Sequence, residues 1–418
     1  MVQFKFEGDF DILGDPQIKL VESVLRNRGY SNGTVLVEQV GIKGDNYVAH
    51  VKRFTYKSEE GSTFKIIGKI APAAEELRNM MKTMLLFNNE IVMYDSILPK
   101  LNDLQNIVGN EDKVIFPACY GVVTEAPYEF ILLEDLNELY FVMLDRLKPL
   151  TNDSIRIVTK DLAMYHSLSL VLRNSEPEVY DNFANKLTNI WAAWDAEPQM
   201  QQFSEAAENE ILEIIDDSDK YKNLVLGSIS KMASHARDHA SYEKDSKYTV
   251  IQQGDCWNNN ILFRLENGTP VQNVMIDYQL SKEGSPAGDI LYFLFNCTDH
   301  ATRLKYYNEW IDYYYEIMES TLKKHGLETS TVFLKERLLA DLKRYSRLAI
   351  GLGLMLSSML SRESKDTFDF KEMSGDKDKM LEDAIANICN LSLDQTTIER
   401  LKGRITGIID TVLELGLL

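Results

Sequence analysis

The stretch Gln253-Gly-Asp-Cys-Trp-Asn-Asn-Asn260 decides the fold. It is a polar segment between two apolar ones, and it places Asp255 five residues before Asn260. Another acid, Asp277, follows the next apolar run, Val274 to Ile276. The oxygen atoms of Asp and Asn are hard ligands suited to Mg²⁺, which takes few protein ligands besides phosphate oxygens and water. An Asp beside such a site can accept the proton of an attacking hydroxyl. The spacing D-x4-N followed by D therefore predicts phosphoryl transfer from ATP.

Each of these acids also has a simpler interpretation. Asp255 and Asp277 are suited to capping turns, and a run of Asn is common in loops. The combination of spacing, flanking apolar segments and chain order favours a catalytic loop over two unrelated turns.

Lys69 and Glu90 form a second, independent signal. Glu90 lies on the apolar face of a predicted helix, at helical spacing from Phe87 and Tyr94. A buried acid needs a compensating cation, because an unpaired buried charge costs several kcal/mol. Lys69 lies near the end of the apolar strand Phe64 to Ile70, and a strand Lys paired with a helix Glu orients the phosphates of ATP in kinases. The simpler interpretation is that Glu90 reaches solvent and that Lys69 is a surface lysine.

Two further segments are candidates for contact with a nucleotide. The turn Gly41-Ile-Lys-Gly44-Asp-Asn-Tyr47 lies between two predicted strands, and its glycines allow backbone N–H groups to approach phosphates closely. It lacks the full G-x-G-x-x-G spacing, so an ordinary hairpin loop is the alternative. Leu133-Glu-Asp-Leu136 is placed either to offer backbone groups to an adenine edge or to serve as a plain connector. The candidate nucleotide contacts in these segments are Gly41, Gly44, Asp45, Asn46, Glu134 and Leu136.

Composition excludes several classes of protein. The chain has 418 residues, of which 44% are hydrophobic and 26% charged, as in ordinary globular proteins. The 45 Lys and Arg against 64 Asp and Glu give a formal charge of −19, which disfavours a general nucleic-acid or anionic-membrane partner. The four Cys have no C-x-x-C spacing, which excludes a thiolate zinc site and fits a reducing compartment.

The sequence also predicts a cytoplasmic location. The first residues contain acids where a signal peptide needs a basic start. The longest uncharged run, Leu348 to Ser361, has 14 residues, whereas a membrane span needs about 20. We expect a small-molecule acceptor as partner, with no nucleic acid, no membrane and no obligate protein partner.

The apolar pattern changes near residue 136. Before this point short β-like runs predominate, with one long predicted helix whose apolar positions run from Leu77 to Leu98 and which ends before Pro99. Beyond it, most of the pattern is helical. The prediction is an α+β, bilobal fold, with a small β-rich nucleotide-binding lobe over residues 1–136 and a larger, mainly α-helical lobe over 137–418. The larger lobe would carry the catalytic loop, the metal site and the acceptor pocket. The strands predicted in the small lobe are Thr34 to Gln39, Tyr47 to Thr55, Phe64 to Ile70 and Phe130 to Leu133.

Together, these segments resemble the ecdysteroid kinase-like family of insects. This family, also called CHK kinase-like, is a branch of the aminoglycoside and choline phosphotransferases within the protein-kinase-like superfamily. The resemblance spans most of the chain, from about residue 30 to about 350. The last segment is the most specific, because generic kinases lack its Q-L-S-x-x-G-S-P ending. The matching segments are GIKGDNY (41–47), IIGKIAP (66–72), LLFNNEIVMYDSILP (85–99), LLEDL (132–136), QGDCWNNNILF (253–263) and IDYQLSKEGSPAGDILYFLF (276–295).

The resemblance implies a protein-kinase-like fold that binds ATP and Mg²⁺ in the cleft between the lobes. Carried over position by position, Asp255 would be the catalytic base, and Asn260 and Asp277 would be the Mg²⁺ ligands. Lys69 would hold the phosphates, and Glu90 would orient Lys69.

Three other residues would support the site. By resemblance, Asp289 would brace the catalytic loop from the following helix, with a helix cap as the simpler role. We expect His166 to be a core or loop-bracing histidine. Gln253 stands where family members usually have His, and we expect it to shape the loop through a hydrogen bond. The metal motif reads Asp-Tyr-Gln instead of Asp-Phe-Gln, a mild change at an aromatic packing position.

By resemblance, the acceptor would be a hydroxyl of an ecdysteroid or another hydroxylated steroid or xenobiotic, as in detoxification. Two alternatives stay open. One is a choline- or aminoglycoside-type kinase with a cationic acceptor. The other is a catalytically weak pseudokinase that binds nucleotide or ligand, for which Gln253 would be the sign.

Overall fold

The N-terminal part of the chain forms a six-stranded sheet in the order β1-β2-β3-β4-β6-β5. β1 is parallel to β2, and the other neighbouring strands are antiparallel. Lys69 lies on β4, paired with Val51 on β3 and with Ile131 on β6, so it sits in the middle of the sheet. The strands are β1 (Phe4–Gly8), β2 (Gly33–Gln39), β3 (His50–Lys57), β4 (Thr63–Ile70), β5 (Cys119–Val123) and β6 (Phe130–Glu134).

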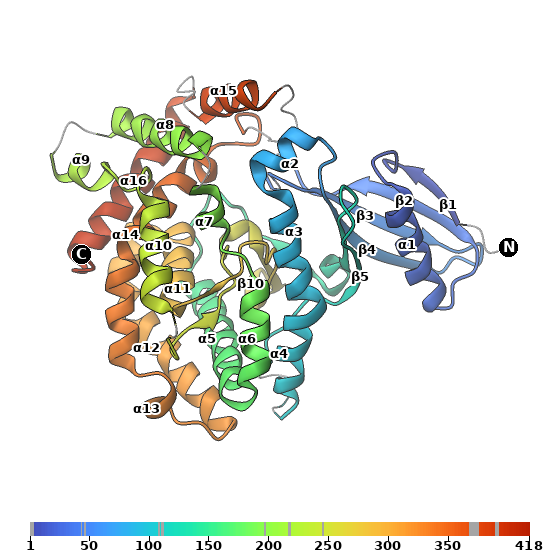
Figure 1. Cartoon of the computed structure of the whole chain (residues 1–418), viewed down its shortest axis with the longest axis horizontal. Coiled ribbons are helices and arrows are strands. Elements are labelled where there is room, and N and C mark those ends of the chain that lie inside the picture. Colours follow the sequence, from blue (N-terminus) through green and yellow to red (C-terminus); the bar gives the residue numbers. More distant parts are fainter. Residues whose placement is uncertain are drawn as a thin grey trace.

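The structure is a computed structural model, and Figure 1 shows the sheet beside a larger helical part. It describes residues 4–418 apart from 43, 46, 108, 110–112, 196–197, 216–218, 245, 368–375 and 389–392. The α+β, bilobal architecture predicted from the sequence is confirmed. A lobe boundary at residue 136 stays a prediction, although the last strand of the sheet ends at Glu134.

A separate hydrophobic core holds one face of the sheet to helix α1 (Asp15–Asn27). Val21 and Leu25 of this helix pack with the β-branched and aromatic residues of the strands, such as Val35 and Phe54. Neither β1, α1 nor β5 was among the predicted elements. Of the predicted strands, the one expected over 47–55 begins later, at His50.

The single helix predicted over residues 77–98 is wrong in detail. Lys82 has φ 54°, in the left-handed region, and breaks the helix into α2 (Glu75–Met81) and α3 (Thr83–Val92). A π-helical turn, η1 (Met93–Ile97), then leads directly into α4 (Leu98–Leu104). Pro99 lies in the first turn of α4, where a missing N–H is tolerated, and so it does not end the helix.

The larger part is built around a second core in which α5, α11, α12, α14 and α16 pack together. The uncharged run predicted as a buried helix lies within α14 and is largely buried. The long helices are α5 (Asn152–Ser175), α8 (Pro198–Ile214), α12 (His300–Lys324), α14 (Lys335–Ser361) and α16 (Gln395–Glu414). The shorter ones are α6 (Pro177–Lys186), α7 (Ile190–Asp195), α9 (Asp219–Val225), α10 (Met232–Glu243), α11 (Pro286–Cys297), α13 (Thr329–Val332) and α15 (Lys377–Ile388).

Short strands of the larger part flank the predicted catalytic loop and hold it in place. Residues 252–257 link β8 to the 3-10 turn η5 (Asn258–Asn260), which leads into β9. β9 and β10 pair as an antiparallel hairpin, so Asp277, two residues past β10, returns to the start of β9. The backbone N–H of Ile276 donates to the carbonyl of Asn260 at 2.9 Å. The remaining elements are η2 (Gln105–Ile107), η4 (Leu136–Leu139), β7 (Phe141–Met143), β8 (Val250–Ile251), β9 (Ile261–Glu266), β10 (Thr269–Met275) and β11 (Glu283–Gly284).

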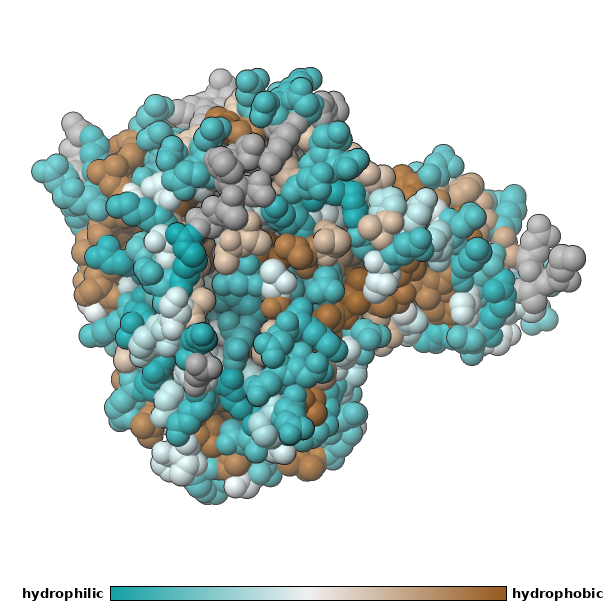
Figure 2. Space-filling model, in the orientation of Figure 1, coloured by the Kyte–Doolittle hydropathy of each residue, from teal (hydrophilic) through white to brown (hydrophobic). Residues whose placement is uncertain are grey.

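Hydrophilic side chains cover most of the face seen in Figure 2, interrupted by apolar patches. In the part of the chain that the structure describes, no helix combines the length and the apolar character needed to cross a bilayer. Cys119, Cys256 and Cys297 carry free thiols, and Cys389 lies outside the described residues.

Candidate active site

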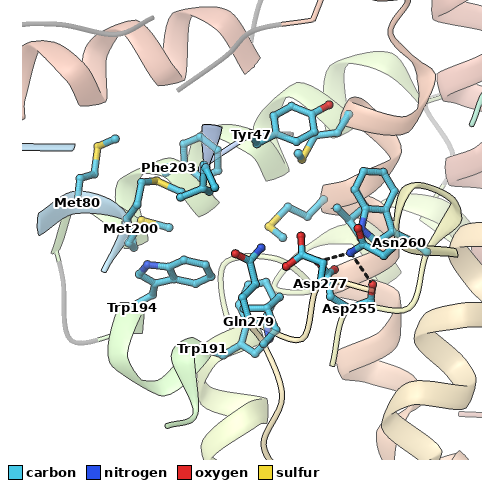
Figure 3. A pocket seen from close by; sticks show the side chains of 18 of the residues that line it. Tyr47, Met80, Trp191, Trp194, Met200, Phe203, Asp255, Asn260, Asp277 and Gln279 are labelled. Carbon is cyan, nitrogen blue, oxygen red and sulfur yellow. Dashed lines mark hydrogen bonds between the residues drawn. The ribbon is translucent and has the colours of Figure 1, made fainter. Parts of the chain in front are cut away.

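Asp255 is held by hydrogen bonds on both of its carboxylate oxygens. The side-chain amide of Asn260 donates to Oδ2 at 2.9 Å and to the Asp255 carbonyl at 2.9 Å. The hydroxyl of Tyr292, from α11, donates to Oδ1 at 2.5 Å. Figure 3 shows Asp255 and Asn260 joined in this way, with Asp277 beside them. The structure thus brings together the three residues predicted from the D-x4-N-then-D pattern.

The backbone of the loop is fixed from α11 by Asp289. The N–H groups of Gln253 and Gly254 donate to its two carboxylate oxygens at 2.7 and 3.0 Å. His166, fully buried on α5, lies 3.0 Å from the same carboxylate through Nε2 and 2.8 Å from the Tyr314 hydroxyl through Nδ1. Asp289 and His166 therefore lie where residues that brace the loop are expected, although their roles stay predictions.

Gln253 connects the loop to the segment that follows β10. Its Nε2 donates to the carbonyls of Ile276 and Asp277 at 2.9 and 3.2 Å. Its Oε1 accepts from the backbone N–H of Asp255 at 2.6 Å. Asp277 has φ 61°, an unusual backbone conformation that this amide helps to stabilise. The hydrogen bond that we expected Gln253 to make is thus present, which is compatible with an intact loop.

Lys69 bridges two carboxylates. Its ammonium lies 2.6 Å from Glu90 Oε2 on α3 and 2.7 Å from Asp277 Oδ1. Burial alone would lower the pKa of Lys69, but the carboxylates of Asp277 and Glu90 outweigh it and raise this pKa. Burial raises the pKa of Glu90 to about 7, although the Lys69 charge opposes it. The predicted pairing of a strand Lys with a helix Glu is present in the structure.

The site gathers more negative than positive charge. Burial, together with the charge of Asp277, raises the pKa of Asp255 to about 7, whereas the Tyr292 hydrogen bond and the Lys69 charge lower it. The Lys69 ammonium contacts the carboxylates of Glu90 and Asp277 and also interacts electrostatically with that of Asp255. A further cation would balance this charge.

Asn260 and Asp277 offer side-chain oxygen atoms that suit a magnesium ion in this site. The amide nitrogen of Asn260 is used by Asp255, which leaves its Oδ1 as the available ligand atom. The Asp277 side chain remains 20% exposed, which leaves it more accessible than Lys69 or Glu90. Mg²⁺ typically takes one or two carboxylates besides water and phosphate oxygens. Among the described residues no cluster of three or more His, Cys, Asp or Glu is placed to hold a metal.

Gly41 and Asp45 of the glycine turn line the site. Gly41 and Gly44 have φ 78° and 99°, and Asp45 Oδ2 accepts from the N–H of Ile42 at 2.8 Å. Gly44 is confined, because a Cβ there would lie 2.9 Å from the Arg146 guanidinium. Asn46 lies outside the described residues.

A cavity lined by the sheet and by residues of β7 and β9 collects most of the predicted nucleotide contacts. Apolar side chains, including Val51, Ile67 and Leu262, line its walls, and Asn260 and Asp277 lie at its end. Gly44 does not line this cavity, although its neighbour Asp45 does. The predicted contacts that line it are Gly41, Asp45, Lys69, Glu90, Glu134 and Leu136.

A second chamber lies next to the first cavity and is lined by Asp255. It shares Asp45, Lys69, Asn260 and Asp277 with the first cavity and contains about 1290 Å³ of empty space, including space open to solvent. Its walls are mainly aromatic and sulfur-containing, as Figure 3 shows. The wall residues include Met80, Met81, Trp191, Trp194, Met200, Phe203, Trp257, Tyr292, Met355, Leu356, Met359, Leu381 and Ala384.

Sequence reasoning missed three kinds of residue at this site. Tyr292 lies in an apolar helical segment, DILYFLF, whose pattern predicts an ordinary core tyrosine. Asn259 lies in the Asn run, but nothing in the sequence indicates that its amide donates to the Gly44 carbonyl at 2.9 Å. The chamber walls come from helices far apart in the chain, so no local pattern marks them.

The comparisons with known proteins agree with this geometry. A model of the ecdysteroid kinase-like family matches residues 43–327, more than half of the chain. The chain belongs to the ecdysteroid kinase-like family. This confirms the family inferred from the sequence motifs and places this ecdysteroid kinase-like protein among kinase-like phosphotransferases.

Solved structures with a similar fold are distant from this ecdysteroid kinase-like protein in sequence. An ethanolamine kinase from Plasmodium vivax is 12% identical, with a TM-score of 0.42, over 91% of this chain and 83% of its own. A mutant of aminoglycoside 2'-phosphotransferase-IIIa in complex with GDP is 12% identical, with a TM-score of 0.43, over 89% of this chain and 95% of its own. No curated protein is significantly similar in sequence.

Proposed function

We propose that this member of the ecdysteroid kinase-like family transfers a phosphoryl group from ATP to a hydroxyl of a largely apolar small molecule, such as a hydroxylated steroid or xenobiotic. One observation carries the proposal. Asp255 lines a wide apolar chamber that shares Lys69, Asn260 and Asp277 with the neighbouring cavity.

The first cavity has the features that a nucleotide needs. Its apolar walls suit a base, and the backbone of Glu134 to Leu136 lies at its edge. Lys69 would bind phosphate oxygens while Glu90 holds its ammonium in place. Asn260 and Asp277 would hold Mg²⁺. When bound, MgATP would supply the phosphoryl group and the positive charge that stabilises its transfer.

Asp255 would act as the base toward the acceptor. One carboxylate oxygen of Asp255 would take the proton of the acceptor hydroxyl as the hydroxyl oxygen forms its bond to phosphorus and the bond from phosphorus to the leaving ADP breaks. Asn260 and Tyr292 donate to this carboxylate and fix its orientation. The neighbouring apolar walls would exclude water, which otherwise competes with the acceptor hydroxyl.

The second chamber favours an apolar acceptor over a polycation. The carboxylates that line it are those of Asp45, Asp255 and Asp277. Two of these have assigned roles in the proposed chemistry, so among the described residues that line the chamber Asp45 remains to neutralise an acceptor's charge. An aminoglycoside carries several ammonium groups, whereas Met, Trp, Phe and Leu side chains supply the dispersion contacts that suit a steroid-like skeleton.

A single quaternary ammonium is the second candidate acceptor. Trp191 and Trp194 lie 5.2 Å apart between ring centroids, in an edge-to-face arrangement, and both line the chamber. Aromatic pairs of this kind bind choline-like cations through cation–π contacts. This feature keeps choline and ethanolamine in the set of acceptors to be compared.

The experiment that tests the proposal measures ADP formation by purified protein with MgATP and a panel of acceptors. The panel contains hydroxylated steroids, phenols and glycosides, with choline, ethanolamine and aminoglycosides as the cationic arm. We expect turnover with apolar hydroxylated compounds and a loss of turnover in Asp255→Asn. Turnover only with cationic acceptors would contradict the apolar assignment. ADP formation that persists in Asp255→Asn would contradict the role of the base.

A further inference from the structure

We propose that Tyr292 is a positioning residue for the phosphoryl transfer. Its hydroxyl sets the direction of the Asp255 carboxylate relative to the second chamber, called the acceptor chamber below. The inference rests on the proposed function, because it assumes that Asp255 is the base. The hydroxyl of Tyr292 donates to Oδ1 of Asp255 at 2.5 Å, and Asn260 donates to Oδ2 at 2.9 Å. The two donors approach different oxygens, so together they define the plane of the carboxylate.

Tyr292 acts from the same helix that fixes the backbone of the loop. Asp289 and Tyr292 are three residues apart on α11 and therefore share a face of the helix. Asp289 binds the N–H groups of Gln253 and Gly254, while Tyr292 binds the side chain of the next residue, Asp255. One rigid helix thus holds both the loop and its reactive group.

The start of α11 is itself well fixed. Pro286 occupies its first turn, and the Ser285 hydroxyl caps the helix by accepting from the N–H of Ala287. The same hydroxyl lies 2.9 Å from Asp341 on α14. This anchoring limits movement of Tyr292, which is only 5% exposed.

The position of Tyr292 distinguishes it from an ordinary core tyrosine. It lines the acceptor chamber on one side and a smaller cavity behind the loop on the other, so it forms part of the wall between them. Among the described residues, no other side chain donates to Oδ1 of Asp255. Without the phenol, the carboxylate would keep only the Asn260 donor and would be free to turn toward either space. A displacement of about 1 Å of a reacting group can cost roughly 100-fold in rate.

The test compares Tyr292→Phe with wild type and with Tyr307→Phe. Tyr307, on α12, is an equally buried tyrosine whose hydroxyl has no partner among the described residues, so it controls for removal of a buried hydroxyl. We expect kcat of Tyr292→Phe to fall roughly 10- to 100-fold. The KM for ATP should change less than about 2-fold, because Tyr292 does not line the first cavity. Tyr307→Phe should keep wild-type kinetics.

Two further measurements distinguish a positioning role of Tyr292 from a purely structural one. Tyr292→His keeps an N–H donor and should retain more of kcat than Tyr292→Phe. Crystal structures of wild type and Tyr292→Phe should show the Asp255 carboxylate turned in the variant. An unchanged kcat, or an unmoved carboxylate, would overturn the inference. Wild type that transfers no phosphate to any acceptor would refute the proposed function, and the carboxylate orientation would still decide whether Tyr292 positions Asp255.

Discussion

Asn259 donates its side-chain amide to the backbone carbonyl of Gly44 at 2.9 Å. This hydrogen bond joins the predicted catalytic loop to the glycine turn between β2 and β3. Asn259 also lines the first cavity. Asn259 is almost fully buried, so water does not compete strongly for the bond. The three consecutive Asn residues thus bind three different places, because Asn258 donates to Lys148 O and Asn260 donates to Asp255.

Asn259→Ala should weaken nucleotide binding. Loss of the bond to Gly44 frees the turn, and one hydrogen bond contributes about 0.5–1.5 kcal/mol, so the KM for ATP should rise roughly 2- to 10-fold. Asn258→Ala removes the neighbouring amide and its bond to Lys148 and serves as the control. Steady-state kinetics with varied ATP measure both. Equal effects of the two variants on this KM would show that the Asn259–Gly44 bond has no special role.

Lys69→Met should abolish turnover and destabilise the fold. Loss of the ammonium should reduce kcat/KM by about 100-fold or more. It also leaves Glu90 buried without its cation, which costs on the order of 3–5 kcal/mol. The double variant Lys69→Met/Glu90→Gln should recover much of the stability but none of the activity. Denaturant unfolding and ADP formation measure the two effects. A double variant as unstable as the single one would argue against a buried ion pair.

Gly254→Ala should disrupt the catalytic loop. Gly254 has φ 88°, and a Cβ there would lie 2.3 Å from the carbonyl oxygen of Leu280. Gly268 provides a matched control, because its φ is 80° but a Cβ there meets nothing within 4 Å. The shared backbone strain costs about 1–3 kcal/mol in either variant. The melting temperature should therefore fall further for Gly254→Ala, and its turnover should be lost. Similar melting temperatures for the two variants would contradict the clash.

Asp161 should make the fold less stable as pH rises. Burial raises the pKa of Asp161 from 3.8 to about 7, although Lys160 and a hydrogen bond from Asn273 oppose this. The folded state therefore binds a proton more tightly than the unfolded state, so this residue's contribution to stability is lost between about pH 4 and pH 7. Asp161→Asn should stabilise the protein more at pH 8 than at pH 5, by on the order of 2 kcal/mol.

Denaturant midpoints at the two pH values test this prediction. Asp181→Asn makes the same change at an exposed position of α6 and should show no such difference. A stabilisation by Asp161→Asn that is equal at both pH values would indicate that packing, not ionisation, is responsible.

Met355→Trp should narrow the acceptor chamber without affecting the nucleotide. Met355 lies on α14 and lines the chamber but not the first cavity. The larger ring should raise the KM for an apolar acceptor several-fold and leave the KM for ATP unchanged. Leu339→Trp, at an exposed position of the same helix, is the control. An unchanged acceptor KM would indicate that the acceptor binds elsewhere.

The sequence predicted which of the proposed site residues lie close together. Asp255, Asn260 and Asp277 could be recognised because Asp255 and Asn260 share the loop before β9, and the β9–β10 hairpin brings Asp277 back to the start of β9. Lys69 and Glu90 could be matched because an acid on an apolar helix face requires a nearby cation. These predictions used local rules that tertiary packing did not override.

The features that were missed depend on tertiary contacts. The break at Lys82 rests on a single left-handed residue, which the continuous apolar spacing from Leu77 onward conceals. Tyr292 has the same sequence environment as a core tyrosine, and its role is visible only from its bond to Asp255. The acceptor chamber combines side chains from α2, α7, α8, α14 and α15, which come together only in the folded chain.

The most direct test of the central claim follows radiolabelled γ-phosphate from ATP to an acceptor. A hydroxylated steroid is compared with its O-methylated analogue, which has the same apolar skeleton but no hydroxyl proton, and with choline. We predict label on the hydroxylated steroid alone, and none when Asp255→Asn replaces wild type, although this variant still binds MgATP. Label on choline and not on the steroid, or transfer that continues in Asp255→Asn, would contradict the account.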